Sequence, residues 1–583
     1  RSQENPLDFL MKEDYKTYGL DDILSSIRKA KENEDIKGIY GECGKNRENV
    51  YKMHGKCIRR FKVEETILND AYEVCKIVNN MPRQQLCQCQ DVISAYVGRL
   101  KELPDSLVRE VITILKSNRN EENTEAYIYL TSIIINITLE AEELVTLEEY
   151  IMQNKKLDAG KKHFLFYQIK RLMFCNKSLK TEQTILLRWK LFQQVVQMYK
   201  MQIKTELKYI PWQERNHNFV LVITEQFLSM EHGPTKTALD RCRTLIRKEK
   251  QVLLVNSAEF GQFYNDCLFY NGISGNYMRN YTDVQEIAWK DVKVPYVQCD
   301  NGMPDPEVLD MLLEMVYQLK PEYIVMIGGN SVFANLADNI VPVLAVGLSP
   351  SVMETTMVSY QTLTRKLDEQ DIRLLHQMGK TEDSIIQSVF TSGLKEQTEH
   401  ITREQLGIPR EAFVLAVVGA RLDVEITDDF CEMLESVLGE DIVVVFLGRY
   451  IKYSEISKEK YPKLKKYSYY LGFCSDILAH LECCDLYINP IRSGGGTSSV
   501  ESLYKGVPVV TTEYGDVPTN VGEAFWVEDY EEMKNVIKRY YSDSEFYQKQ
   551  SEYALQRVKR LLDTDGEFVK IISEMERREQ CKA

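Results

Sequence analysis

The sequence predicts an α/β protein: two doubly wound domains that face a cleft, preceded by an all-helical domain. Up to about residue 215, glycine and proline are sparse and apolar residues recur at helical spacing, as in residues 107–115. From Pro211 onward, short apolar runs alternate with helical stretches. A polar stretch near residues 393–402 interrupts this alternation once, and a second alternating series then begins. Strands that alternate with helices form parallel sheets covered on both faces.

The first domain, residues 1–215, is expected to consist of packed helices. Its most apolar run, Tyr127 to Leu139, is too short to cross a bilayer and contains polar residues, so it predicts a buried helix. Residues 154–180 are rich in lysine, arginine and aromatic residues. This segment is either a docking face for an acidic partner or a solvated helix face, and the pattern favours the solvated face. We expect this domain to bind an acceptor or a partner protein.

The second domain is expected over residues 216–393 and the third over residues 394–583. The apolar runs of the second domain predict strands at 219–223, 252–255, 292–297, 323–327 and 341–346. Those of the third predict strands at 414–418, 442–447, 467–471, 486–489, 507–510 and 525–527, followed by C-terminal helices. Ligands of open α/β sheets bind at the carboxyl ends of the strands, so a cleft between these two domains is the predicted site.

The bulk composition excludes several classes of function. The net charge is −14 over 583 residues, which argues against a general nucleic-acid or membrane-surface role. No apolar run is long enough for an integral membrane segment. The chain has 14 cysteines, but none lie at zinc-site spacing. Reduced thiols of this kind are typical of a cytoplasmic protein.

A glycine-rich loop follows the predicted strand at 486–489. Gly494, Gly495 and Gly496 are followed by three hydroxyl residues, Thr497, Ser498 and Ser499, at the expected start of a helix. The N-terminus of a helix presents unpaired N–H groups, and glycines allow a phosphate to approach them closely. The spacing matches neither a P-loop nor the dinucleotide-binding fingerprint. The loop therefore predicts a diphosphate site of another kind.

Glu501 lies one turn into the helix that follows this loop. A carboxylate at this position can accept hydrogen bonds from two adjacent ribose hydroxyls. Alternatively, the glycines form a tight turn and Glu501 is an acidic residue at a helix start. Three glycines with three hydroxyl residues exceed what a turn requires, so the nucleotide interpretation is favoured.

The second half of the chain resembles nucleotide-sugar glycosyltransferases of the GT-B fold, in particular glycosyltransferase family 41. That family includes O-linked N-acetylglucosamine transferases and bacterial cytoplasmic N-glycosyltransferases. The resemblance is carried by residues 478–510, which include Asn489-Pro490, the small-residue loop, Glu501 and Gly506-Val-Pro-Val-Val. Residues 341–350 and 223–237 are similar to further family motifs. The resemblance implies that Asn489 and the loop lie at a UDP-sugar donor, that Glu501 binds its ribose, and that the acceptor is a protein side chain.

The chain departs from the family where the donor diphosphate binds. The family usually has a lysine on the first helix of the nucleotide domain, whereas this chain has Glu425 near that position. We expect Arg421 to bind the diphosphate instead, with Arg449 as the alternative, because a guanidinium stays charged and can donate two parallel hydrogen bonds. Arg421 could equally form a surface ion pair with Asp423 or Glu425. Ser349 stands where the family has a histidine.

Retaining GT-B enzymes often carry a second glutamate eight residues before the ribose glutamate, but this chain has Ser493 there. The pattern therefore favours inversion by direct displacement. An acceptor must then lose a proton, and His232 is the predicted base, with Glu225 as the alternative. No metal motif appears, and the resemblance to GT-B enzymes implies that side chains and helix dipoles take the place of a metal. No cofactor is expected, since the UDP-sugar is a co-substrate.

Two other functions fit the same sequence. The acceptor could be a glycan or a small molecule. A second possibility is a catalytically inactive adaptor that partners an active transferase, which Glu425 in place of the lysine would explain. Residues Gly328 to Ser331 also follow a predicted strand, and they are either a sugar or acceptor contact or a turn with a helix cap.

Overall fold

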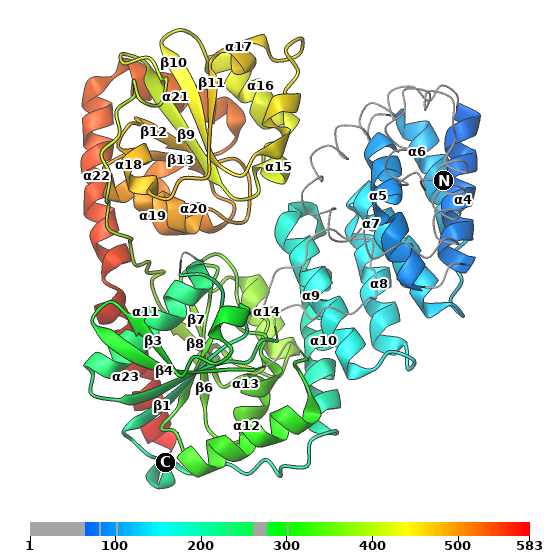
Figure 1. Ribbon diagram of the computed structural model, residues 1–583, viewed down its shortest axis with the longest axis vertical. Coiled ribbons are helices and arrows are strands. Elements are labelled where there is room, and N and C mark those ends of the chain that lie inside the picture. Colours follow the sequence, from blue (N-terminus) through cyan, green and yellow to red (C-terminus); the bar gives the residue numbers. More distant parts are fainter. Residues whose placement is uncertain are drawn as a thin grey trace, which may run out of the picture. The chain divides into compact units, whose positions relative to one another are not determined.

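The structure is a computed structural model that describes residues 64–80, 83–100, 103–230, 232–259, 277–299 and 302–582. These residues form two compact units, which adjoin in sequence at Leu191 and Phe192. The first unit is helical. The second contains two separate sheets, drawn in green and in yellow to orange in Figure 1.

The helical unit consists of consecutive helices joined by short connections. Four of them, α4, α5, α6 and α7, share one apolar core. The helices are α4 (Glu64–Asn80), α5 (Arg83–Leu100), α6 (Asp105–Ser117), α7 (Thr124–Thr138), α8 (Ala141–Gln153) and α9 (Ala159–Cys175), followed by α10 (Glu182–Lys200), which the boundary between the two units divides. Every residue of α7 from Ala126 to Ile135 is buried, which confirms the prediction of a buried helix there.

The sequence favoured a solvated helix face for the basic and aromatic segment at residues 154–180, and this prediction is wrong. It forms α9, and most of that helix is buried, including Lys162 and His163. The ammonium of Lys162 donates to the carbonyl of Met152, 2.9 Å away. Apolar residues occur on all sides of α9, so burying the helix is favourable despite its charges. The long lysine stems can lie along apolar surface while their ammonium groups reach polar atoms.

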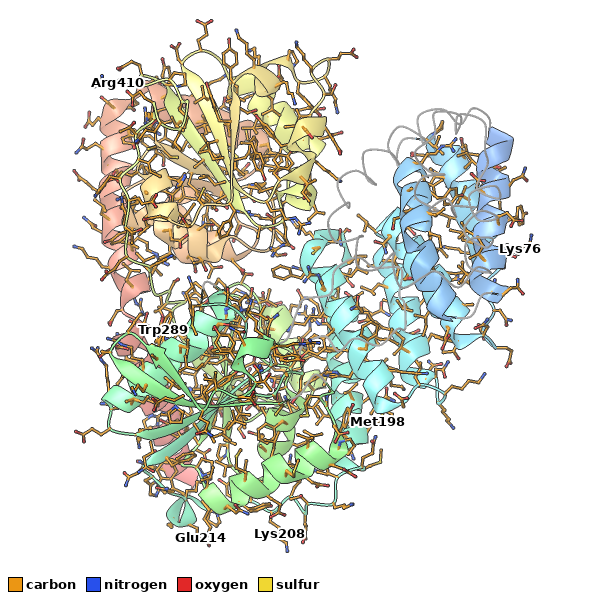
Figure 2. The ribbon with its side chains drawn as sticks, viewed as in Figure 1. Lys76, Met198, Lys208, Glu214, Trp289 and Arg410 are labelled. Atoms are coloured by element: carbon orange, nitrogen blue, oxygen red, sulfur yellow. The ribbon has the colours of Figure 1, made fainter. Side chains whose placement is uncertain are left out.

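The first sheet has the order β3-β4-β2-β1-β5-β6-β7-β8 and is parallel except for the β3–β4 pair. Its strands are β1 (Phe219–Thr224), β2 (Gln251–Asn256), β3 (Glu286–Trp289), β4 (Val292–Gln298), β5 (Ile324–Ile327), β6 (Val343–Val346), β7 (Tyr360–Leu363) and β8 (Ile385–Gln387). All six residues of β1 are buried, as expected for a central strand covered on both faces. Trp289 of β3, labelled in Figure 2, donates to Asp240 at 2.8 Å.

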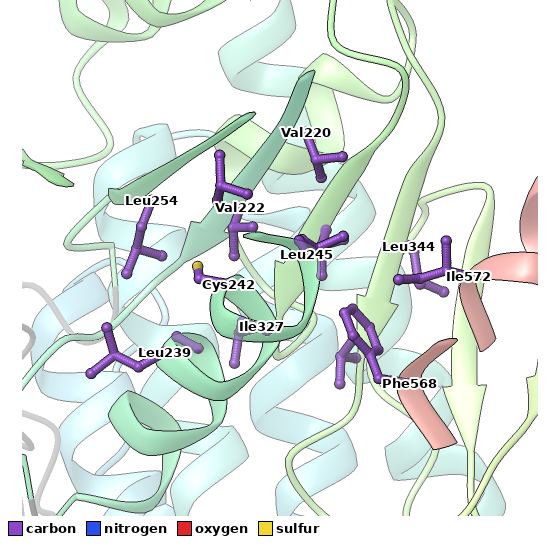
Figure 3. Close-up of a cluster of buried hydrophobic side chains, with 14 of the residues drawn as sticks. Val220, Val222, Leu239, Cys242, Leu245, Leu254, Ile327, Leu344, Phe568 and Ile572 are labelled. Carbon is purple, nitrogen blue, oxygen red and sulfur yellow. The ribbon is translucent and has the colours of Figure 1, made fainter. Parts of the chain in front are cut away.

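The helices of the first sheet are α11 (Gly233–Arg247), α12 (Pro306–Leu319), α13 (Val332–Ala337) and α14 (Glu369–Gln377). A fifth helix, α23 (Thr564–Lys582), comes from the far end of the chain and packs against α11. Figure 3 shows Phe568 and Ile572 of α23 beside Ile327 and Leu344 in the core of this sheet. The expected boundary at residue 394 assigned this helix to the other sheet, whereas its apolar side chains lie in the core of the first.

The second sheet is entirely parallel, with the order β11-β10-β9-β12-β13-β14, the doubly wound order of Rossmann-like domains. Its strands are β9 (Phe413–Gly419), β10 (Ile442–Gly448), β11 (Ser468–Gly472), β12 (Leu486–Ile488), β13 (Val509–Thr512) and β14 (Trp526–Val527). The helices are α15 (Leu422–Glu425), α16 (Asp428–Val437), α17 (Pro462–Lys466), α18 (Ile477–Leu481), α19 (Gly496–Tyr504), α20 (Asp516–Val521), α21 (Tyr530–Ser542) and α22 (Ser544–Leu562).

Two chain segments connect the domains that carry the sheets. The predicted polar stretch follows β8, and the amide of Ser392, just before this stretch, donates to the carbonyl of Leu561 at the end of α22. The guanidinium of Arg241, on α11, donates to Thr391 of the first connection at 2.9 Å and to Thr564 of the second at 3.3 Å. The connections therefore lie side by side against α11.

Candidate active site

The glycine-rich loop joins β12 to α19 at the carboxyl edge of the second sheet. Gly495 is the residue before α19 and has φ = 96°, a left-handed conformation that favours glycine. A side chain here would also collide with its surroundings, because a Cβ would lie 2.6 Å from Nη2 of Arg492. The predicted helix start after the three glycines is therefore correct, and Gly495 is required by both its backbone and its neighbour.

The three hydroxyl groups after the glycines have different surroundings. Ser498 donates to the carbonyl of Gly495 at 3.0 Å, and Ser499 donates to that of Gly496 at 2.8 Å. These two serines are therefore engaged within the helix start. The Thr497 hydroxyl makes no hydrogen bond to another described residue, and Thr497 lines a cavity shared with the first α/β domain. Of the three predicted donors, Thr497 has the hydroxyl available to a ligand.

Arg492 lies behind the loop, and its side chain is only 3% exposed. Its guanidinium donates to Asn489, Tyr487 and Glu425 at 2.8, 2.8 and 2.7 Å, respectively. Asn489 is itself fully buried and donates to Thr511. Sequence reasoning placed Asn489 at the donor and assigned no role to Arg492. The available signal was a lone charge inside a loop of small residues directly after a buried strand.

Glu425 binds two arginines at once. Besides Arg492, it pairs with Arg421, whose Nη2 lies 3.0 Å from Oε1 of Glu425. The ion-pair interpretation of Arg421 is thus correct for Glu425, whereas Asp423 accepts from the amide of Lys452. The side chain of Arg421 is 36% exposed and that of Glu425 is 8% exposed. Two guanidinium groups and one carboxylate give this cluster a net charge of +1.

Arg449 follows β10 and is exposed. Its backbone bridges the strand ends: the amide donates to Gly419 at 3.0 Å, and the carbonyl accepts from Leu422 at 3.2 Å. The guanidinium makes no hydrogen bond or ion pair to another residue within the described ranges. Arg421 and Arg449 therefore both lie at the edge of the sheet that carries the glycine loop.

Glu501 is half-buried on α19, and its carboxylate forms no hydrogen bond or ion pair with any residue that the structure describes. Burial raises its pKa to about 7, and the nearby Lys236 ammonium opposes this shift. Lys236 belongs to α11 of the other α/β domain. A half-buried carboxylate without a hydrogen-bond partner in this region suits a ligand that donates hydrogen bonds.

His232, the predicted base, is the residue before α11. Its Nδ1 lies 3.2 Å from the hydroxyl of Thr235. Burial and the charge of Lys236 lower its pKa to about 4, so the imidazole is neutral at physiological pH and only weakly basic.

Glu225, the alternative base, is buried at the end of β1. Its Oε1 would lie 2.8 Å from a Cβ on Gly328, so the absence of a side chain on Gly328 makes room for it. Glu259 follows β2 and accepts hydrogen bonds from Ser331 and from the amide of Phe333, both at 3.1 Å. Burial, with a contribution from Glu225, raises the pKa of Glu259 to about 8.

Ser331 accepts from the amide of Ala334 and begins α13, which confirms the turn-and-cap interpretation of residues 328–331. Asn330 and Ser331 are fully buried.

Ser349 and Ser493 occupy two positions where the chain departs from the resembled family. Ser349, in place of the histidine, donates to Asp516 of α20 at 2.6 Å, and Ser351 donates to the same oxygen at 2.7 Å. Ser493, in place of the second glutamate, is buried, and its hydroxyl lies 3.2 Å from that of Tyr514. The hydrogen bonds from Ser349 and Ser351 to Asp516 link the two α/β domains.

Within the described ranges, the acidic, histidine and cysteine side chains do not gather in threes suited to a metal ion. The helices there also include none with the length and apolarity to span a membrane.

The chain is similar to a known family in sequence and to known proteins in structure. Residues 398–557 match the family model described as glycosyl transferases group 1. An O-GlcNAc transferase mutant from Thermobaculum terrenum has a TM-score of 0.50 at 11% identity, over 90% of this chain and 100% of that one. A glycosyltransferase from Rickettsia africae has a TM-score of 0.46 at 12% identity, covering 63% of this chain and 100% of its own. HepE from Anabaena, solved with UDP, has a TM-score of 0.43 at 14% identity, covering 61% and 99%.

None of the curated proteins compared with the chain matches it in sequence. The sheet orders, the crossing of α23 to the first sheet and the matched domain lead to one conclusion. The chain has the GT-B fold of nucleotide-sugar glycosyltransferases, and its second α/β domain matches the group 1 glycosyl transferases.

Proposed function

We propose that the protein is a glycosyltransferase that transfers a sugar from a UDP-sugar to a protein side chain, with inversion at the anomeric carbon. The observation that carries this proposal is Glu501. Its carboxylate is half-buried beside a glycine-rich helix start and has no hydrogen-bond partner within the described residues. Two adjacent ribose hydroxyls would provide the two donors that this carboxylate lacks.

The charges around the loop support a diphosphate donor. The glycine-rich loop leads directly into α19, so the N-terminal amides and the positive end of the helix dipole lie at the loop. Arg421 is partly exposed, and its cluster with Glu425 and Arg492 keeps one positive charge in excess. That charge would stabilise the diphosphate as it departs. Uridine as the base and a protein side chain as the acceptor are inferred from the resemblance to glycosyltransferase family 41.

Inversion is supported by the side chain at position 493. A retaining arrangement would have a carboxylate there, whereas Ser493 is a buried hydroxyl close to Tyr514. In the proposed reaction, the acceptor attacks the anomeric carbon from the face opposite the diphosphate. The bond from that carbon to the diphosphate oxygen breaks, UDP leaves with the electron pair, and the acceptor proton passes to a base.

Glu225 is the stronger candidate for that base. The pKa of His232 is lowered to about 4, so at neutral pH its imidazole has little affinity for a proton. Glu225 lies at the carboxyl end of β1, at the edge of the sheet where ligands of doubly wound domains bind. The helical unit would then hold the acceptor protein or a partner. A cytoplasmic location fits the free thiols of the described cysteines.

A second candidate function is an inactive adaptor, and the Arg421–Glu425 ion pair favours it. A guanidinium already bound to a carboxylate would have to exchange that partner for a diphosphate. An adaptor would bind UDP without turnover, whereas an enzyme would release free sugar or transfer it.

The test is a thermal-shift screen of the full chain with nucleotides and nucleotide sugars, followed by a UDP-release assay. A ligand at 100 times its dissociation constant stabilises the folded state by about 2.7 kcal/mol. For a domain of this size, this corresponds to a rise in Tm of about 5–10 °C. We expect UDP and one UDP-sugar to produce that rise, and Glu501→Ala and Arg421→Ala to abolish both binding and UDP release. No shift with any uridine nucleotide refutes the proposed donor.

A further inference from the structure

Lys236 occupies an unusual position for a lysine. It lies in the first turn of α11, where the helix dipole disfavours a positive charge. Its side chain is half-buried, and its ammonium forms no ion pair or hydrogen bond with another residue in the described part of the chain. Helix stability and pairing with an acidic side chain therefore both fail to explain why a lysine is there.

The surroundings of Lys236 point to the donor loop. A cavity of about 110 Å³ is lined by residues of both α/β domains. Lys236 and Gly233 line it from the start of α11, and Thr497 lines it from the start of α19. The start of α11, the Lys236 ammonium and the Thr497 hydroxyl thus share this space and favour a negatively charged ligand. Arg241 and Asp240 also line the cavity, and the Asp240 carboxylate accepts from Trp289 and pairs with Lys290.

Lys236 also interacts electrostatically with the proposed nucleotide site. Its ammonium lowers the pKa of the Glu501 carboxyl, against the larger effect of burial. It also contributes to the lowered pKa of His232, on its own domain. The charge of Lys236 therefore affects the pKa of one group in each α/β domain, the Glu501 carboxyl and the His232 imidazole.

The cations of the second α/β domain near the glycine-rich loop include two that share one carboxylate. Glu425 stands near the position where the resembled family has a lysine, and it binds Arg421 and the buried Arg492. We propose that Lys236 supplies a further cation from the first α/β domain and binds the diphosphate of the donor. This inference rests on the proposed function, because it assigns a further donor-binding residue to the same site.

A purely structural role for Lys236 makes a different prediction. If Lys236 only balanced the charge of Glu501, its loss would alter the binding of uridine and of UDP by the same factor, because both carry the ribose. If Lys236 binds the diphosphate, its loss weakens UDP and pyrophosphate and spares uridine. The ratio of the uridine and UDP dissociation constants therefore separates the two roles.

The experiment is isothermal titration calorimetry of the full chain with uridine, UDP and inorganic pyrophosphate. The variants are Lys236→Met, Lys236→Arg and Lys248→Met. Lys248 is the control, because it is exposed at the other end of the same helix. We expect Lys236→Met to weaken UDP and pyrophosphate by about tenfold to a hundredfold and uridine by less than about twofold. Lys236→Arg should recover most of the UDP affinity, and Lys248→Met should match the wild type.

Equal UDP affinity in Lys236→Met and wild type overturns the inference while the proposed donor site stands. Equal weakening of uridine and UDP also overturns it, in favour of the structural role. If pyrophosphate binds through Lys236 but uridine and UDP do not bind, the inference holds and the choice of uridine fails. If the wild type binds neither UDP nor pyrophosphate, both proposals are refuted.

Discussion

Replacing Glu425 with glutamine should destabilise the loop region of the second α/β domain far more than replacing its partly exposed partner Arg421. Glu425 is 8% exposed, Arg492 is 3% exposed, and their charged atoms lie 2.7 Å apart. Arg492 is also held by Asn489 and Tyr487, so its guanidinium cannot move out to water. Glu425→Gln therefore leaves a buried positive charge without a counter-ion, which costs about 3–5 kcal/mol.

The two arginines on Glu425 provide matched comparisons. Arg421 is 36% exposed, so its ion pair contributes no more than about 1 kcal/mol, and Arg421→Gln should change stability by less than that. The double variant Glu425→Gln/Arg492→Met removes both buried charges. It should be more stable than Glu425→Gln alone, because two contacting residues do not contribute independently.

Hydrogen–deuterium exchange followed by mass spectrometry measures this effect locally. A loss of about 3–5 kcal/mol corresponds to a loss of protection of about two to three and a half orders of magnitude in peptides from β9 and α19. Peptides from β1 and β5 in the other domain serve as the internal reference. Exchange in α19 within a factor of about ten of the wild type would refute the reasoning, as would a double variant less protected than Glu425→Gln.

Three further predictions concern single side chains. Gly495→Ala should destabilise the second α/β domain by more than about 1–2 kcal/mol in thermal denaturation, because it adds a collision with Arg492 to left-handed strain, whereas Gly439→Ala, in open space, should not. Burial raises the pKa of Glu501 from 4.5 to about 7, so the folded state keeps a proton that the unfolded state loses between these values. The free energy of unfolding therefore falls as the pH rises from 4.5 through 7. Glu501→Gln should raise the free energy of unfolding at pH 8 by up to about 3 kcal/mol, and Tm with it. At about pH 4.5 it should change neither. If Glu225 rather than His232 is the base, His232→Gln should retain most of kcat between pH 6 and 8, and a hundredfold loss would contradict that assignment.

The apolar periodicity predicted most of the sheet architecture, because central parallel strands are nearly continuous apolar runs. Each strand predicted from such a run is present, with ends shifted by one to a few residues. The missed strands are β3, β7 and β8, which are short and carry polar or small residues such as Gln361 and Gln387. These three strands form because they pair with neighbouring strands. A pattern of apolar residues within one strand does not reveal such pairing.

The candidate site was predicted where it depends on local backbone and missed where it depends on distant partners. The glycines and Glu501 lie within one strand–helix junction, so their roles follow from a single stretch of sequence. Arg492 lies in the same stretch, but its partner Glu425 is 67 residues away. The burial of α9 was missed for a similar reason, since its lysines contact carbonyls and rings that the helical pattern does not reveal.

The packing of α23 has a consequence for the order in which the protein acquires its structure during synthesis. Phe568, Ile571, Ile572 and Met575 complete the core of a domain whose first strand begins some 350 residues earlier. The emerging chain therefore cannot finish this domain until α23 has left the ribosome. The second α/β domain, which lies between, has every strand of its sheet available before then. Of the two α/β domains, the one that translation begins first is thus completed after the other has its whole sheet.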